Sequence, residues 1–269
     1  MKSMLLYANR DPGLEARLQA ALDATRRFDG HLTCLLVTPQ DAFILGDPFG
    51  GVYALPTVVD QVRKVAEDQR EALEARLAGE GVQWECLRFD GAPAQVIVDR
   101  ARLADLVVLS LPGSGRDASA THEITADVLV HARAPTLAMP QQGRSFDAGA
   151  PAMVAWDGSR ESSHALRLTL PVLRCAAAVH VVTVADGHTE FPATDACRYL
   201  ARHGIEPELA EWPRKGRSIA AALVDAAERA GAGYMVMGAY GHTRLREAVL
   251  GGTTREMLHE SRLPLLLAH

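Results

Sequence analysis

The chain repeats one arrangement of segments, and this internal repeat constrains the fold more than any other feature. The run Met-Val-Ala-Trp-Asp at 153–157 resembles Leu-Leu-Tyr-Ala-Asn at 5–9, since each is a short apolar segment closed by a small polar side chain. Two later pairs of segments also resemble each other: 97–110 and 223–238, and 134–140 and 263–269. Self-similarity at long spacing marks a repeat architecture. The chain is therefore predicted to contain two copies of one module.

The two copies differ in length. Asp157 follows Asn9 by 148 residues (157 − 9), whereas Gly238 follows Ser110 by 128 (238 − 110), so the first copy carries about 20 extra residues between these points. We expect the extra residues in a loop over 41–60, which is rich in glycine and proline. The first domain is predicted to cover 1–140 and the second 151–269. The polar segment 141–151 is the predicted linker between them.

Short β-rich segments alternate with amphipathic helical patterns in both copies. Strands are expected near 4–8, 32–37, 82–88, 105–110, 135–139, 152–156, 179–184, 207–211, 233–237 and 264–268. Helices are expected near 14–27, 58–78, 92–102, 118–132, 160–176, 193–203, 218–230 and 253–261. Runs such as 106–109 and 234–237 are apolar on both faces, which is typical of a parallel sheet covered by helices on both sides.

The predicted fold class is α/β, with two open, doubly wound, five-stranded parallel-sheet modules of Rossmann-like type in tandem. In such sheets, ligands bind beyond the carboxyl ends of the strands, where the strand order reverses. We therefore look for a binding site in the segments that follow the strands.

Composition excludes several classes of protein. A chain of 269 residues with 48% hydrophobic and 23% charged residues is globular rather than disordered, collagenous or coiled-coil. The net charge of −5 argues against a nucleic-acid partner. The start of the chain has too short an apolar run for a signal peptide, and no stretch approaches the roughly 20 apolar residues that span a bilayer. The four cysteines lack metal-ligand spacing, so we expect reduced thiols in a cytoplasmic protein without a membrane partner.

A glycine-rich loop in the second half is the most informative segment for function. Gly238 and Gly241 follow an apolar strand, where a missing Cβ lets backbone approach a ligand. Gly251 and Gly252 precede a helix that is predicted to start at Thr253, with Thr253 and Glu256 as a capping box. A helix N-terminus fronted by glycines presents free N–H groups to an anion. A phosphate chain could lie along Gly241, Gly251, Gly252 and Thr253, with Arg244 adding a charge-assisted bond. In the alternative reading, these glycines only shape turns and a helix cap.

The spacing Gly238-x2-Gly241-x9-Gly251, together with a last strand that follows Pro264, resembles the universal stress protein family. The resemblance covers the second half and, more faintly, the first, so the chain is similar to a tandem form of that family. It implies a fold of the adenine nucleotide alpha-hydrolase-like type and a loop that holds the phosphates of ATP. One departure is Gly252, which stands where the family often has Ser or Thr, so that Thr253 would have to supply the hydroxyl.

The resemblance also assigns roles to single residues. Asp157 matches the family's acidic residue at the adenine and ribose end of the site, and Val184 matches a hydrophobic residue that brackets the adenine. Met237 would play a similar apolar part, and His242 borders the loop within reach of phosphate. The alternatives from the residues alone are an N-cap for Asp157, core positions for Val184 and Met237, and an exposed histidine at 242.

The first half lacks the glycine loop. Aligned through the prolines of the last strands (264 − 135 = 129), Gly251 and Gly252 fall on His122 and Glu123, where a carboxylate would repel phosphate. The first half is therefore predicted not to bind ATP in the family manner, and to hold another ligand or serve as a packing partner. The resemblance further implies that the last strands, 136–139 and 265–268, adjoin and mimic a two-fold dimer within one chain.

The expected function is binding of ATP or another adenine nucleotide by the second module, with or without Mg²⁺, in ligand-dependent regulation or a stress response. A regulatory protein partner and a homodimer of the tandem chain are left open. No general base is evident beside the loop, so no catalytic residue is assigned, and slow ATP hydrolysis is the most that we expect. No metal-ligand cluster is evident either. The alternatives are a protein–protein interaction module without nucleotide, and an enzyme that forms AMP and pyrophosphate, for which Trp156-Asp-Gly-Ser159 is too short a match.

Overall fold

The computed structural model describes residues 1–39, 45–46, 52–53, 56–113, 118–142, 145–184, 191–241 and 252–269. The elements of the first half are β1 (Ser3–Tyr7), α1 (Leu14–Phe28), β2 (His31–Thr38), β3 (Leu45–Gly46), β4 (Val52–Tyr53), α2 (Pro56–Leu77), β5 (Gln83–Asp90), α3 (Pro93–Arg100), the 3₁₀-helix η2 (Ala101–Leu103), β6 (Leu106–Ser110), α4 (Ala118–His131) and β7 (Thr136–Met139). Those of the second half are β8 (Ala152–Ala155), α5 (Arg160–Leu168), α6 (Leu170–Leu173), β9 (Val179–Val184), α7 (Ala193–Arg202), β10 (Pro207–Trp212), α8 (Ile219–Arg229), β11 (Tyr234–Gly238), α9 (Gly252–Glu260) and β12 (Leu265–Ala268).

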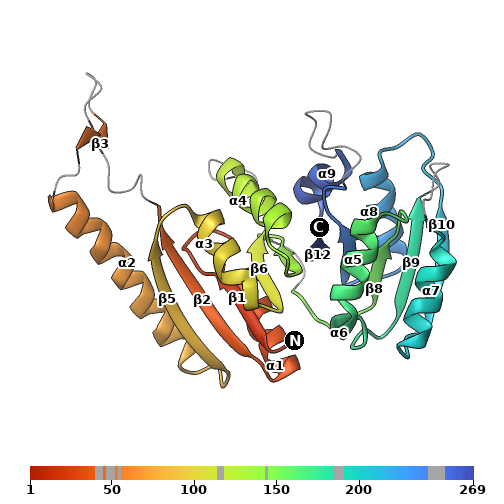
Figure 1. Cartoon of the computed structure of the whole chain (residues 1–269), viewed down its shortest axis with the longest axis horizontal. Coiled ribbons are helices and arrows are strands. Elements are labelled where there is room, and N and C mark those ends of the chain that lie inside the picture. The colour runs from red at the N-terminus through yellow and green to blue at the C-terminus, as the bar shows by residue number, and fades with distance from the viewer. Residues whose placement is uncertain are drawn as a thin grey trace.

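Ten of these strands form one continuous sheet with helices on both faces (Figure 1). Its order is β10-β9-β8-β11-β12-β7-β6-β1-β2-β5. Within each half the five strands of this sheet are parallel. The first three along the chain lie successively closer to the outer edge of the sheet, and the last two lie on the other side of the first, toward the centre. The reversal lies between β8 and β11 in the second half and between β1 and β6 in the first. The predicted doubly wound fold is confirmed.

Two segments differ from the expected elements. The helix expected over 160–176 is divided into α5 and α6 at Thr169, because Pro171, two residues later, has no backbone N–H with which to continue the hydrogen-bond ladder. In the extra segment of the first half, α2 already begins at Pro56, and a short antiparallel pair, β3 with β4, precedes it. The rest of the expected loop over 41–60 lies outside the described residues.

Alternate residues of the central strands enter cores on opposite faces of the sheet. In β11, Tyr234 and Val236 belong to the core under α1, α2, α5, α6 and α7, whereas Met235 and Met237 belong to the core under α8 and α9. In β6, Val107 faces a third core under α3 and α4. This two-sided burial explains why these strands read as continuous apolar runs. In the described part of the chain, no helix is long and apolar enough to cross a membrane.

The segment between the halves is packed against the sheet at one aromatic side chain. Phe146 is 2% exposed, and its ring meets that of Tyr234 edge-on, with centroids 5.4 Å apart. The hydroxyl of Tyr234 donates to the carbonyl oxygen of Ala148 at 3.5 Å. The predicted linker is therefore anchored in the core at its centre.

The two halves meet through their last strands. β7 pairs antiparallel with β12, with Leu137 opposite Leu266. On either side of this pair, Ala138 lies opposite Leu265 and Thr136 lies opposite Leu267. Two copies of the same strand related by a two-fold axis pair in this way, since each residue then meets the counterpart of its partner. The expected pairing of 136–139 with 265–268 is thus present within one chain.

A stacked pair of histidines crosses the same junction between α4 and α9. The rings of His122 and His259 have centroids 4.8 Å apart and an interplanar angle of 22°. Burial lowers the pKa of His122 below 6.5, and the neighbouring His259 and Arg255 add to this effect, which Glu123 opposes. Nδ1 of His122 is buried and lacks a hydrogen-bond partner among the described residues. The folded protein therefore favours the neutral imidazole at this position.

This preference predicts a loss of stability in mild acid. Because the pKa of His122 is lower in the folded state, the unfolded chain binds the proton first, and the free energy of unfolding falls as the pH drops below 6.5. We expect His122→Phe, which keeps a stacked ring, to lose less stability than the wild type between pH 7.5 and 5.5. Urea denaturation at both pH values measures this difference. An unchanged pH dependence in the variant would assign the acid sensitivity to other groups.

Candidate functional site

The strongest candidate site lies at the carboxyl ends of the strands in the second half, where β8 and β11 flank the reversal of strand order. Met237 of β11 lies opposite Ala155 of β8, and the residues that follow each strand emerge side by side. Ligands of doubly wound sheets bind in this crevice. The described residues here that were predicted to bind are Asp157, Val184, Met237, Gly238, Gly241, Gly252 and Thr253. His242, Arg244 and Gly251 lie outside the described residues.

Asp157 shapes the turn between β8 and α5. Its Oδ1 accepts a hydrogen bond from the backbone N–H of Ser159 at 3.0 Å. Ser159 is the N-cap of α5, since its hydroxyl accepts from the N–H of Ser162 at 3.1 Å. Asp157 therefore supports the cap without being the cap residue, and its exposed carboxylate stays accessible at the end of β8.

Gly238 lies against the first turn of α5. A Cβ on Gly238 would lie 2.5 Å from the backbone nitrogen of Ser162 and 2.7 Å from the carbonyl carbon of Glu161. Real Cβ atoms do not approach backbone so closely, so only glycine permits this contact between helix and strand. The structure thus gives Gly238 a packing role, and contact with a ligand stays a prediction.

Gly241 has a different neighbour, the buried side chain of Glu161. A Cβ on Gly241 would lie 3.4 Å from Oε2 of Glu161, which is ordinary van der Waals contact. Glu161 is 6% exposed and lies in the first turn of α5, where the helix dipole favours a carboxylate. Glu161 was not among the residues predicted from the sequence. Its signal was an acidic side chain four positions after Asp157, at the start of the helix.

Tyr240 ties the glycine loop to α9. It adopts a left-handed backbone conformation with φ of 52°, and its N–H donates to Oγ1 of Thr254 at 3.3 Å. Its side chain is 5% exposed, and burial raises the pKa of its phenol, an effect that Arg255 opposes. A non-glycine residue in this conformation stores strain that the surrounding contacts must hold. The loop therefore has a defined shape at the position between Gly238 and Gly241.

The helix after the loop begins one residue earlier than expected. α9 starts at Gly252, so Thr253 lies inside the first turn. The predicted capping box of Thr253 with Glu256 is therefore wrong. The contact with Tyr240 is made by the hydroxyl of Thr254 rather than by Thr253. Gly252 still places a backbone N–H without a side chain at the helix N-terminus, the arrangement that binds anions.

An apolar wall borders the site next to β9. Val184 is half-buried and packs, like Trp212 and Ile219, against the rim of the core beneath α8. Met237 is 5% exposed and belongs to the same core, so packing accounts for its hydrophobicity. The basic turn 214–217 lies after β10, and the pKa of Asp225 is lowered chiefly by its hydrogen bond with Arg217, 2.9 Å away. That arginine is thus already paired with a carboxylate.

The corresponding crevice of the first half is filled by its own side chains. Asn9 follows β1 as Asp157 follows β8, and its amide donates to the carbonyl of Val37 at 2.6 Å and accepts from its N–H at 2.8 Å. The strand register makes Val37 the counterpart of Val184. The backbone groups that Val37 could offer to a ligand are therefore occupied by Asn9.

Arg17 completes this filling. Its guanidinium is fully buried and donates to the carbonyl of Tyr7 at 2.6 Å, to the carboxylate of Asp11 at 2.6 Å and to the hydroxyl of Ser110 at 2.9 Å. It also donates to the carbonyl of Asn9. Among the described residues, the buried charged side chains are Arg17 and Glu161, one in each half. In the first half, a buried guanidinium thus supplies hydrogen-bond donors to the backbone carbonyls and the hydroxyl at the strand ends.

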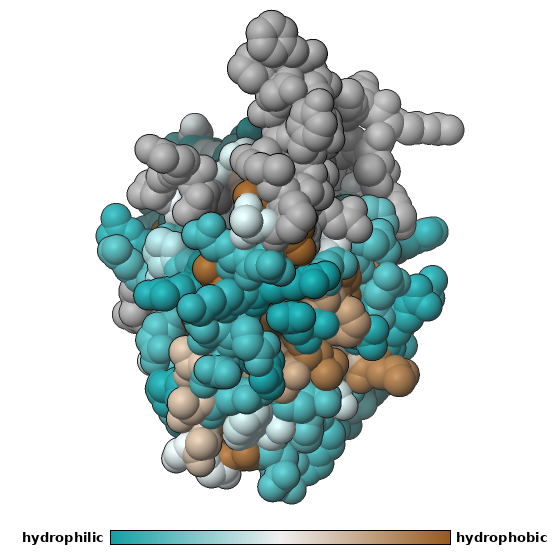
Figure 2. Space-filling model, turned by 90° about the vertical axis from the view of Figure 1, so that its left-hand side faces the viewer, coloured by the Kyte–Doolittle hydropathy of each residue, from teal (hydrophilic) through white to brown (hydrophobic). Residues whose placement is uncertain are grey.

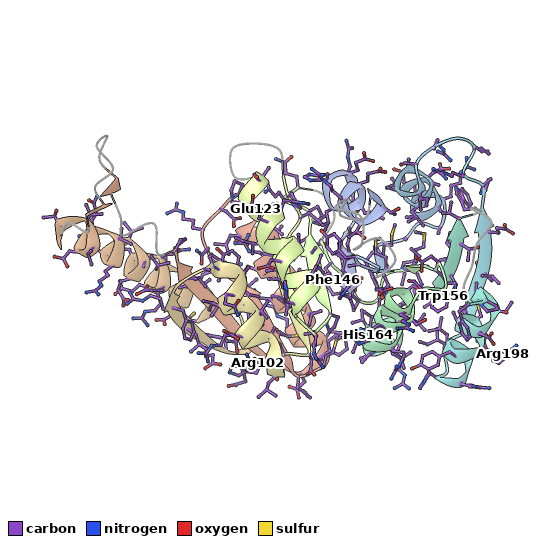
Figure 3. The ribbon with its side chains drawn as sticks, turned by 45° about the horizontal axis from the view of Figure 1, so that its top comes forward. Arg102, Glu123, Phe146, Trp156, His164 and Arg198 are labelled. Carbon is purple, nitrogen blue, oxygen red and sulfur yellow. The ribbon has the colours of Figure 1, made fainter. Side chains whose placement is uncertain are left out.

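The helix that follows also differs. With the offset of 129, Gly252 aligns with Glu123, but α4 begins at Ala118, five residues before Glu123 (123 − 118). Figure 3 shows Glu123 on α4 and Trp156 and His164 in the other half. The start of α4 therefore aligns in sequence with the last residues of the glycine-rich segment of the second half, which lie outside the described residues. In the described ranges, no group of three His, Cys, Asp or Glu side chains could hold a metal ion.

Comparison with known proteins gives the family. The sequence matches the model of the universal stress protein family twice, over residues 1–140 and 151–269. The chain belongs to the universal stress protein family. No curated protein matches it.

Solved structures share its fold over nearly the whole chain. A universal stress protein from Archaeoglobus fulgidus DSM 4304 is 16% identical, with 99% of this chain and 96% of that chain covered and a TM-score of 0.75. A structure from Pseudomonas aeruginosa UCBPP-PA14, also described as a universal stress protein, is 15% identical, with coverage of 100% and 93% and a TM-score of 0.58. At such identities the similarity shows the fold alone. Both neighbours share the fold of this chain over both of its halves.

In this universal stress protein, the two glycines of the loop should respond differently to a small side chain. We expect Gly238→Ala to lower the free energy of unfolding by about 1–3 kcal/mol, because the added Cβ overlaps the backbone of α5. Gly241→Ala should change it far less, since its Cβ finds ordinary contact distance. Chemical denaturation of both variants measures these changes. Equal losses of unfolding free energy would show that the close contact of Gly238 with α5 does not determine the cost of the substitution.

Proposed function

We propose that the second half of this universal stress protein binds ATP at the carboxyl ends of β8, β9 and β11. The phosphates are placed at Gly241 and the N-terminus of α9, and the adenine is placed against Val184. Asp157, exposed at the end of β8, is the acceptor proposed for the ribose or the adenine amino group. The site offers hydrogen-bond donors and an apolar wall, so binding rather than turnover is the chemistry that it supports.

The difference between the two strand-order reversals carries this proposal. In the first half, Asn9 and Arg17 satisfy the polar groups of the strand ends, and α4 begins five residues before the position that aligns with Gly252. In the second half, Asp157 is exposed and α9 begins with a glycine. Two copies of one module have diverged at this position, and the second keeps the backbone donors that a phosphate needs.

Glu161 bears on the form of the nucleotide. Its carboxylate lies against Gly241, where we place phosphate, and like charges at close range oppose binding. A divalent cation on the phosphates offsets this repulsion, since Mg²⁺ is commonly held by one or two carboxylates together with substrate phosphates. We therefore propose that ATP binds as its magnesium complex. Carboxylate and phosphate oxygens are the hard ligands that this ion prefers, so the residues present fit it.

The biological role that fits such a site is regulation. A protein that binds a nucleotide without turning it over can report its concentration, provided that the bound and free forms differ in their affinity for a partner. We propose ligand-dependent regulation in a stress response, in the cytoplasm, through a protein partner. Slow hydrolysis of ATP is the limit of the catalysis proposed.

The first test is the ligand itself. We expect mass spectrometry of the molecule released from the purified, denatured protein to detect an adenine nucleotide, and calorimetry of the stripped protein to show one ATP site per chain. Gly241→Val should weaken binding by at least about tenfold, or about 1.4 kcal/mol, because the branched side chain blocks the backbone approach. Ser110→Ala, at the matching strand end of the first half, is the control and should leave the affinity unchanged. Absence of both bound ligand and ATP affinity would favour the protein–protein module.

A second test concerns the magnesium ion. We expect chelation of Mg²⁺ to weaken ATP binding by the wild type more than by Glu161→Gln, since the amide removes the negative charge beside Gly241 while it keeps the shape. Glu260→Gln, at the opposite end of α9 from the proposed phosphate position, provides a matched loss of charge. Calorimetric titrations with and without a chelator measure the dependence. Equal magnesium dependence in all three proteins would place the ion away from Glu161.

A further inference from the structure

Two cysteines face each other across neighbouring strands at the outer end of the first half. Cys34 of β2 is the register partner of Cys86 of β5. Directly paired residues of parallel strands point to the same face, and the strands lie about 4.8 Å apart. A disulfide needs a Cα–Cα separation of about 4.4–6.8 Å. The backbone thus already holds the two cysteines at bonding range.

Both thiols lie in the same core beneath α2. Cys34 is fully buried there with Leu73 and Leu77 of that helix, and Cys86 is half-buried against the same group. The interaction between the two thiols lowers the pKa of Cys86 and raises that of Cys34, which burial raises further. Cys86, the more accessible sulfur, is therefore the thiol of the pair that ionises more readily.

The position of β5 gives Cys86 an approach from solvent. β5 is an end strand of the ten-stranded sheet and pairs only with β2 among the described strands. Figure 2 views the molecule from this end, where hydrophilic side chains cover most of the surface. Besides the thiol of Cys34, Arg70 of α2 lowers the pKa of Cys86, whereas burial and the carboxylates of Glu74 and Glu85 raise it. Arg70 is itself paired with Glu74 at 2.7 Å.

The other two cysteines provide a contrast within the same chain. Cys175 donates to the carbonyl of Pro171 at 3.5 Å, and the pKa of Cys197 is raised by burial. Neither is a register partner of another cysteine in the described sheet. A thiol–thiol pair in register is therefore a feature of β2 and β5, and the nucleotide site lies in the other half of the molecule.

We propose that Cys34 and Cys86 are a redox-active dithiol that hydrogen peroxide or an organic hydroperoxide converts to an intramolecular disulfide. The Cys86 thiolate attacks the peroxide, so that an S–O bond forms, the O–O bond breaks, and water or an alcohol leaves after protonation. The Cys34 sulfur then attacks the sulfenic sulfur; the S–S bond forms, the S–O bond breaks, and a second water leaves with the Cys34 proton. Two thiols are oxidised by two electrons and one peroxide is reduced.

The disulfide would restrict local opening of the sheet at its end strand, β5. It would tie the outer strand β5 covalently to β2 and close the chain between them, which includes all of α2. Constraining a long loop stabilises the folded state relative to the unfolded one. Local opening of β5 and α2 would be suppressed by oxidation, and the effect would be confined to the first half.

The test is peroxide treatment of the full chain, followed by alkylation of free thiols and tryptic mapping without reductant. We expect two of the four thiols to disappear, the peptides 28–63 and 77–88 to appear as one linked species lighter by two hydrogen atoms, and dithiothreitol to restore both thiols. The peptide 175–198 carries Cys175 and Cys197 together and is the internal reference, expected to remain alkylated.

Variants separate the disulfide from other oxidation. The double substitution Cys175→Ser and Cys197→Ser should leave the linked peptide unchanged. Cys34→Ala should instead drive Cys86 to sulfinic acid, because no resolving thiol remains. Sulfinic acid on Cys86 in the wild type without the linked peptide, a disulfide between two chains, or oxidation of 175–198 before 77–88 would each overturn the proposal.

Discussion

The antiparallel pairing of β7 with β12 is the contact on which the rest of the architecture depends. It converts two five-stranded sheets into one ten-stranded sheet and removes two sheet edges from solvent, where exposed edges promote association with other chains. The pairing is centred on Leu137 and Leu266, so each half presents the same strand to the other. Because this symmetry lies inside one chain, the two copies were free to differ elsewhere, which separate subunits of a homodimer cannot do.

The halves differ most clearly in the packing of one strand end against one helix, which is β6 against α1 in the first half and β11 against α5 in the second. In the second half the glycine is on the strand, where Gly238 admits the backbone of α5. In the first half it is at the start of the helix: a Cβ on Gly13 would lie 2.5 Å from the hydroxyl of Ser110. The close approach is therefore kept while the small residue changes sides. This exchange leaves a hydroxyl at the end of β6 that Arg17 uses, and a bare backbone at the end of β11.

Most of the fold could be predicted from the sequence, because strands buried on both faces and helices buried on one produce distinct hydrophobic patterns. The division of the helix after β8 also had a signal, in Pro171. Features that depend on a single buried side chain had no such signal in the sequence. Arg17 and Glu161 occupy helical positions that read as solvent-facing, and only tertiary contacts show that they are enclosed. Phe146 stands alone in a polar segment without periodicity, so its anchoring role was invisible. At the site, the residues that emerge from strands could be placed, whereas the capping box at Thr253 failed because the helix begins at Gly252.

The opposite character of the two crevices follows from one electrostatic requirement. Strands that end together expose carbonyls, N–H groups and side chains that must be satisfied by the protein, by water or by a ligand. The first half satisfies them internally, with a buried guanidinium that donates to Tyr7, Asn9, Asp11 and Ser110, and a ligand would have to displace these bonds. The second half places its buried charge, Glu161, on the helix side and leaves Asp157 exposed at the strand end. The ligand proposed for this crevice brings both a cation for the carboxylates and an anion for the backbone donors, as a magnesium–nucleotide complex does.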